Sequence, residues 1–539
     1  IKRNSMRKRF SILTLSVLVF VALFLGMQIN SVISGDNIFV QLNKFKDVLS
    51  MAEKFYVDEI DTQKLVESAI NGMLSELDPH SVYIPASQLP KINEDFQGSF
   101  EGIGVEYDVI NDTLLVVAPV SGGPSEALGI LAGDKIVKIN DTSSIGIKRE
   151  DVPKKLRGPK GTHVKVAIYR PGEKDLFEFD ITRDKIPLYS VDVSYMINDK
   201  VGYVNVNRFS QTTHDEFVSA LNKLRSQGMK KLILDLRNNS GGYLEQAYKM
   251  ADELLPKGKK IVYTKGRRPE FNEDYTSAGG NFTDISLIIL VNPGSASASE
   301  IVSGAVQDWD RGLIVGETTF GKGLVQRQLE LSDKSAVRLT IARYYTPSGR
   351  LIQRPYGKDM QEYRKAALDK EEQEGDNIEH QREGDSTKPI FATASGRKVY
   401  GGGGITPDYI IKAERLTSFS VQLRSKGVFA EHKTAYLDRN GRTLRQQYEK
   451  DLKRFLSDFK VTDEMLDDLE AIAKKKGVTI EKDQFDKDRR FIKTLIKSEI
   501  AYAIWGNEGR FRVYHADDAQ LQKALTLFPE ADKIFGSRQ

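Results

Sequence analysis

The alternation of strands and helices between residues 186 and 415 constrains the fold more than any other feature of the sequence. Two segments within it have apolar centres: SLIILVN at 286–292 is almost continuously apolar, and KLILDLR at 231–237 contains the apolar run 232–234. Strands of this kind are typical of sheets that are covered on both faces. Segments with the apolar spacing of amphipathic helices separate the strands, as at 214–228 and 244–255. We therefore expect an α/β layered core.

The rest of the chain divides by pattern into further regions. With about 150 residues per domain, a length of 539 residues predicts three or four folded units. The expected fold is a multidomain α+β chain in which a β-rich domain precedes the α/β core, with helical regions at both ends. The predicted boundaries are 1–36 for a membrane or signal segment, 37–96 for a helical region, 97–184 for the β-rich domain, 185–415 for the core with a polar, solvated insertion at 365–388, and 416–539 for a separate helical domain.

Composition excludes several classes of function. The formal net charge of +4 is too small for a dedicated nucleic-acid surface on a chain of this length, so we expect no nucleic-acid partner. With no Cys, the chain has neither thiolate metal ligands nor a cysteine nucleophile. No two of its six His residues have the spacing of a helical zinc motif. We expect no metal and no cofactor.

The N-terminal segment indicates export. Five basic residues lie within the first nine positions, and residues 10–35 carry no charge. The strongly apolar part, 10–29, is close to the ~20 residues that span a bilayer. The basic flank predicts that this end stays in the cytoplasm. We expect an uncleaved inner-membrane anchor of a bacterial envelope protein facing the periplasm; a cleaved signal peptide, which would leave the protein in the periplasm, is the alternative.

Three serines, Ser295, Ser297 and Ser299, lie where an apolar strand gives way to a helix. A serine there is close to unpaired N–H groups and to the positive end of the helix dipole, which suits the stabilisation of an oxyanion. The alternative is that these serines only cap the helix, together with Glu300 in its first turn. The usual G-x-S-x-G hydrolase motif is absent from this segment.

A lysine between two glycines follows, in GETTFGKGLVQ at 316–326. Burial can lower the pKa of a lysine by up to ~3–5, and a neutral Lys322 could then take the proton of a serine hydroxyl. An exposed lysine in a surface turn is the alternative.

Taken together, VNPGSASASEI at 291–301 and GETTFGKGLVQ resemble the C-terminal processing peptidases, also called tail-specific proteases. The resemblance implies that Ser297 is the nucleophile, that Lys322 is the general base, and that Gln326 orients the lysine. His80, in the family-like stretch LDPHSVYI, is assigned no catalytic role.

The same resemblance implies an oxyanion hole. One donor would be the backbone N–H of Ala298, and the other would come from the glycine turn DLRNNSGG at 235–242. Between its two glycines, Gly241 is placed slightly ahead of Gly242.

The β-rich region looks like a PDZ domain. GIGVEYDV at 102–109 implies a backbone nest around Gly102, Ile103 and Gly104 that captures a peptide C-terminus, beside an apolar pocket formed partly by Ile103 and Val105. A β-rich spacer without a ligand is the alternative.

The expected function is that of a serine endopeptidase that recognises proteins or peptides with apolar C-termini and has a crotonase/ClpP-like core. A homo-oligomer is possible, but the sequence does not determine the oligomeric state. One rival is a catalytically inactive PDZ adaptor or chaperone on a protease scaffold. The other is a crotonase-type acyl-CoA enzyme, against which the export signal and the peptide-binding domain argue.

Overall fold

A computed structural model describes residues 19–21, 37–357, 360–368, 372–380 and 388–536. The chain divides into two compact units, residues 1–77 and 78–539. The apolar segment 10–29 lies outside the described residues except for 19–21. Among the helices that are described, none is both long and apolar enough to cross a bilayer.

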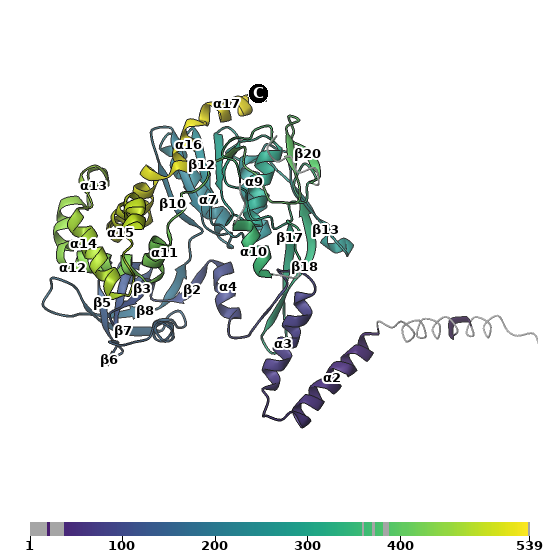
Figure 1. Ribbon diagram of the computed structural model, residues 1–539, viewed down its shortest axis with the longest axis horizontal. Helices are drawn as coiled ribbons and strands as arrows, with labels where there is room; N and C mark the ends of the chain where they lie inside the picture. The colour runs from purple at the N-terminus through teal and green to yellow at the C-terminus, as the bar shows by residue number, and fades with distance from the viewer. Residues whose placement is uncertain (1–18, 22–36, 358–359, 369–371, 381–387, 537–539) are drawn as a thin grey trace, which may run out of the picture. The chain divides into compact units, whose positions relative to one another are not determined.

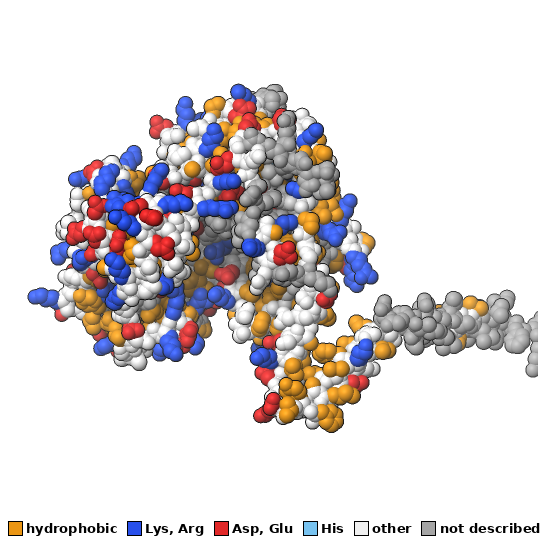
Figure 2. Space-filling model, in the orientation of Figure 1, with side chains coloured by type: hydrophobic (Ala, Val, Ile, Leu, Met, Phe, Trp, Pro, Cys, Tyr) orange, Lys and Arg blue, Asp and Glu red, His pale blue; other side chains and the backbone are white. Residues whose placement is uncertain are grey.

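The first unit contains two helices, α2 (Ile38–Phe55) and α3 (Thr62–Ser75). α3 begins at Thr62 because the Asp61 side chain accepts the N–H of Lys64 at 3.0 Å and so caps the first turn. None of the residues of α2 is buried, and most of its apolar side chains are exposed (Figure 2).

In the second unit, the β-rich domain expected at 97–184 is a sheet in the order β3-β4-β5-β7-β8, with β6 paired to β5. Asn111 and Asp112 form the hairpin turn between β3 and β4, and both have positive φ, 48° and 59°. The elements are β3 (Val105–Ile110), β4 (Thr113–Pro119), α5 (Pro124–Ala127), β5 (Lys135–Ile139), β6 (Thr142–Ser143), α6 (Val152–Leu156), β7 (His163–Tyr169) and β8 (Phe177–Thr182).

The α/β core is built on a seven-stranded sheet in the order β10-β11-β12-β15-β16-β22-β19. The five strands from β11 to β22 run parallel, and an antiparallel strand closes each edge. Every residue of β11, β15 and β16 is buried, which explains their apolar sequences. The strands are β10 (Val191–Met196), β11 (Val201–Val206), β12 (Lys231–Asp235), β15 (Ser286–Val291), β16 (Leu313–Gly316), β19 (Gly375–Asp376) and β22 (Tyr409–Ile410).

Helices cover both faces of this sheet (Figure 1). One face packs against α7 (Thr213–Ser226), α8 (Leu244–Leu254) and α9 (Ala298–Asp308). The other packs against α16 (Ala519–Thr526) and α17 (Phe528–Gly536). The last two helices therefore belong to the α/β core. The prediction of a separate helical domain over 416–539 is wrong for them, because their apolar side chains cover the second face of the sheet.

A second, five-stranded sheet carries part of the site, in the order β1-β18-β13-β14 with β17 paired to β18. Two short pairs, β2 with β9 and β20 with β21, complete the strands. The elements are β1 (Val82–Ile84), α4 (Leu89–Gln97), β2 (Ser99–Gly102), β9 (Asp184–Pro187), β13 (Lys260–Gly266), β14 (Asp274–Thr276), β17 (Leu324–Glu330), β18 (Ala336–Tyr345), α10 (Met360–Leu368), β20 (Ile390–Ala392) and β21 (Lys398–Tyr400).

Within the polar stretch 365–388, residues 369–371 and 381–387 lie outside the described residues, and part of the remainder is not a solvated loop. Its residues 375–376 form β19, which pairs with β22 at the edge of the central sheet. Asn377 and His380 are buried, and the Asn377 side chain donates to the carbonyl of Pro407 at 3.1 Å. The prediction of a solvated loop is wrong for these residues, because polar side chains here pair with other polar groups inside the protein.

The preceding C-terminal helices form a core of their own, as the amphipathic patterns predict. Their outer faces carry intermixed acidic and basic side chains (Figure 2). The helices are α11 (Ser418–Ser425), α12 (Val428–Tyr448), α13 (Leu452–Asp458), α14 (Asp463–Lys475) and α15 (Lys482–Asp517), the last with a non-helical break at Gly506.

Candidate active site

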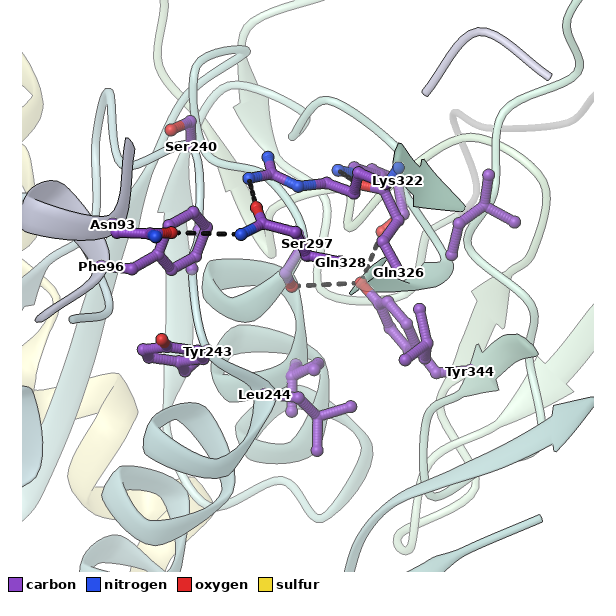
Figure 3. A pocket seen from close by; sticks show the side chains of 16 residues that line it. Asn93, Phe96, Ser240, Tyr243, Leu244, Ser297, Lys322, Gln326, Gln328 and Tyr344 are labelled. Atoms are coloured by element: carbon purple, nitrogen blue, oxygen red, sulfur yellow. Dashed lines mark hydrogen bonds between the residues drawn. The ribbon is translucent and has the colours of Figure 1, made fainter. Parts of the chain in front are cut away.

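Ser297 stands apart from its two serine neighbours. The hydroxyls of Ser295 and Ser299 are buried and donate to the carbonyls of Leu236 and Asn239, each at 2.8 Å. Ser297 lies at the start of α9 with φ 54° and ψ −109°, a backbone conformation that non-glycine residues rarely adopt. Its side chain lines a cleft of about 530 Å³ (Figure 3).

Lys322 lines the same cleft, where burial lowers the pKa of its ammonium to about 8. The positive charge of Arg338 contributes to this lowering of the pKa, whereas the negative charges of Glu300 and Asp78 oppose it. Lys322 Nζ donates to Gln326 Oε1 at 2.8 Å, and the Gln326 amide in turn donates to the backbone carbonyl of His80. The structure thus brings together the three residues predicted to be catalytic, and His80 contributes a backbone carbonyl.

Glu300 connects the serine segment to the lysine segment. Its fully buried carboxylate accepts the N–H of Ser297 at 2.8 Å and the N–H of Lys322 at 2.9 Å. It also accepts bonds from Thr319 Oγ1 and Gly321 N. Burial raises the pKa of Glu300 to about 7, against these hydrogen bonds, which lower it. The capping interpretation therefore holds for Glu300, but its bonds to residues 319–322 were not predicted.

Tyr344, on β18, is a further residue that the sequence did not reveal. Its buried hydroxyl lies 2.7 Å from the carbonyl oxygen of Lys322 and 3.1 Å from that of Ser297. Tyr344 and Glu300 thus hold the same two backbone segments together from different sides. No local pattern around Tyr344 distinguishes it from an ordinary buried aromatic residue of a strand.

The backbone N–H groups predicted to bind the oxyanion differ in whether they already donate a hydrogen bond within the protein. The N–H of Gly241 donates to the Asn239 side chain at 2.9 Å. Among the described residues, no acceptor is found for the N–H of Ala298 or of Gly242. The hydrogen bonds therefore favour Gly242 over Gly241 as the second donor. Gly241 has a packing role instead, because a Cβ there would lie 2.9 Å from the Cβ of Ser297.

At the PDZ domain, one edge of β3 pairs with β4, and within the described part of the chain no strand pairs with the other edge. Gly102 ends β2, and Gly104 has a φ of +72°. The side chain of Ile103 is buried in the domain core, whereas Val105 is partly exposed. Ile103 therefore contributes packing rather than the wall of an open pocket, and the backbone nest remains a prediction.

Four family models match the chain. They are peptidase family S41 at residues 200–360, a PDZ domain at 115–170, the activating protease CtpB N-terminal domain at 27–87, and a family of unknown function (DUF8443) at 419–506.

Among similar proteins, a carboxy-terminal-processing protease of Bartonella bacilliformis is 38% identical over 342 residues, covering 62% of this chain and 78% of the relative. A probable CtpA-like serine protease of Staphylococcus aureus is 37% identical over 344 residues, covering 64% and 68%. Among solved structures, the photosystem II D1 C-terminal processing protease is 31% identical, with a TM-score of 0.33 and coverage of 57% of this chain and 89% of that one.

Proposed function

The chain belongs to peptidase family S41, as a C-terminal processing serine protease with a PDZ domain, and we propose that Ser297 and Lys322 carry out its cleavage reaction. The observation that carries this assignment is the placement of Ser297 and a desolvated Lys322 in one cleft, with Gln326 bonded to the lysine amine. Because the chain belongs to this family, its core is not that of a crotonase-type acyl-CoA enzyme, the second alternative drawn from the sequence.

The proposed reaction begins with neutral Lys322, which takes the proton of Ser297 Oγ while that oxygen attacks the scissile carbonyl carbon. The resulting oxyanion would be held by the N–H groups of Ala298 and of the glycine turn, where Gly242 is available. As the tetrahedral intermediate collapses, the leaving amine takes the proton from Lys322. Water, deprotonated by the same lysine, then attacks the ester and releases the acid product and Ser297.

PDZ domains bind peptide C-termini, and we propose that this one selects apolar C-termini. The free edge of β3 supports this, because an extended peptide can pair with it through main-chain hydrogen bonds. We further propose an envelope location at the periplasmic side of the inner membrane. The basic residues before the apolar segment 10–29 support that location.

A cleavage assay on one model protein with either apolar or charged C-terminal residues tests these proposals. The wild type should cleave the apolar form faster, and Ser297→Ala and Lys322→Ala should abolish cleavage. Ser303→Ala is the matched control, since Ser303 lies on the same helix and its hydroxyl bonds only the carbonyl of Ser299. Cleavage by Ser297→Ala would overturn the assignment, and an inert wild type would favour the adaptor alternative.

A further inference from the structure

The cleft contains a second basic side chain, Arg338 on β18. None of the residues that line the cleft is acidic. When Lys322 is neutral, as the reaction requires, Arg338 is the one fully charged side chain among these lining residues. A cleft with this charge favours an anionic group on whatever enters it.

Arg338 is partly buried and has few partners. Its Nη2 donates to Gln328 Oε1 at 3.0 Å, and its guanidinium lies 5.1 Å from the ring centroid of Phe96. Within the described part of the chain, no carboxylate lies within ion-pairing distance of it. A guanidinium has five N–H donors and can bind a carboxylate through two parallel hydrogen bonds. Most of its bonding capacity is therefore left for a ligand.

Neighbouring side chains hold the guanidinium in place. Gln328 lies directly opposite Arg338 in the pairing of β17 with β18. While its Oε1 accepts from Arg338, its Nε2 donates to Asn93 Oδ1 at 3.1 Å, so the three side chains form a chain of bonds across the cleft wall (Figure 3). An arginine fixed in this way loses less entropy when it binds a carboxylate.

The strand register relates this group to the catalytic residues. Gln326 and Gln328 are two residues apart on β17, so their side chains project from the same face of the strand. The step between them is about 7 Å, at roughly 3.4 Å per residue. An extended substrate has nearly the same rise, so Arg338 should reach a substrate side chain within about three residues of the scissile bond.

We propose that Arg338, held by Gln328 and Asn93, is a specificity-determining residue that binds an acidic side chain of the substrate near the scissile bond. This inference rests on the proposed function of the cleft. Binding of this acidic side chain in the cleft would be separate from the binding of the substrate C-terminus that is proposed for the PDZ domain.

Quenched fluorescent peptides with one shared apolar C-terminus test the proposal. Asp, Asn or Lys is placed in turn at each of the three positions on either side of the scissile bond, and kcat/KM is measured. At one position the wild type should prefer Asp to Asn by roughly 10- to 100-fold, the range expected for a charged hydrogen bond. Arg338→Met should abolish this preference, and Arg338→Glu should replace it with a preference for Lys.

Arg343→Met is the matched control, because Arg343 is on the same strand but exposed and outside the cleft. The Asp-to-Asn ratio within one enzyme cancels any effect of the substitution on the pKa of Lys322, since both peptides meet the same free enzyme. Equal rates for Asp and Asn at every position, or an Asp preference that survives in Arg338→Met, would overturn the proposal. If no peptide is cleaved at all, the proposed function fails and the inference fails with it.

Discussion

Replacing Lys322 by methionine should stabilise the protein at neutral pH while it abolishes cleavage. Burial lowers the pKa of this lysine from its usual 10.5 to about 8. At pH 7 the folded protein must therefore carry a buried ammonium that the unfolded chain would hold in water. Methionine has a similar length and fills the same space without a charge.

The size of the effect follows from the difference between the two pKa values. At about 1.36 kcal/mol for each tenfold change in proton affinity, the cost of the charged lysine at pH 7 is about 3 kcal/mol. The substitution also leaves Gln326 Oε1 without its donor, which costs about 1 kcal/mol. The net gain in unfolding free energy should be about 2 kcal/mol at pH 7.

The stability difference between Lys322→Met and the wild type should also depend on pH. Between pH 8 and 10.5 the unfolded chain binds more protons at this lysine than the folded protein does, so the stability of the wild type rises with pH in that window. At pH 9.5 the cost falls to about 1.4 kcal/mol, and the advantage of Lys322→Met should shrink by about 2 kcal/mol.

Urea denaturation of both proteins at pH 7 and pH 9.5 measures this change. Lys223→Met, at an exposed position on α7, is the control and should differ little from the wild type at either pH. Lys322 is not a desolvated base if Lys322→Met has no higher unfolding free energy than the wild type at pH 7. The same conclusion follows if the difference in unfolding free energy is equal at pH 7 and pH 9.5.

Three further outcomes are expected. Wild-type kcat/KM should increase with pH around a midpoint near 8, because neutral Lys322 is the base; a flat profile from pH 6 to 9 would contradict this. Glu300→Gln places an amide N–H₂ against backbone donors, so kcat should fall at least about tenfold with little change in KM. Asp518→Asn weakens a bidentate pair with Arg237, so urea denaturation should show a loss of about 1–3 kcal/mol, whereas Asp532→Asn, in an exposed pair, should lose less than about 1 kcal/mol.

The local elements of the site were largely predictable from sequence. The strand ending before Asn292, the helix after Ser297 and the glycine-flanked Lys322 each have a local signature, either apolar periodicity or turn residues. The assignment of roles among the three serines required the family resemblance, since their spacing is symmetric. Contacts within the structure then separate them, because only Ser297 has a hydroxyl that is not bonded to the 236–239 turn.

The long-range contacts were not predictable. The bonds from Glu300 to Thr319 and Gly321, and those of Tyr344, join segments whose proximity depends on how two sheets pack. The preference for Gly242 over Gly241 was not predictable for a similar reason, because it depends on where the Asn239 side chain points. The insertion was misjudged because polar composition predicts solvation, yet Asn377 finds buried polar partners.

The location of α16 and α17 has a practical consequence for dissecting the protein. The similarity to peptidase family S41 ends near residue 360, and a recombinant catalytic fragment would naturally be cut before residue 416. Such a fragment would lack Leu521 and Phe528, which cover one face of the central sheet, and would leave Arg237 without Asp518. The peptidase therefore needs α16 and α17 to complete its interior, and limited proteolysis that removes these helices should inactivate the enzyme by unfolding.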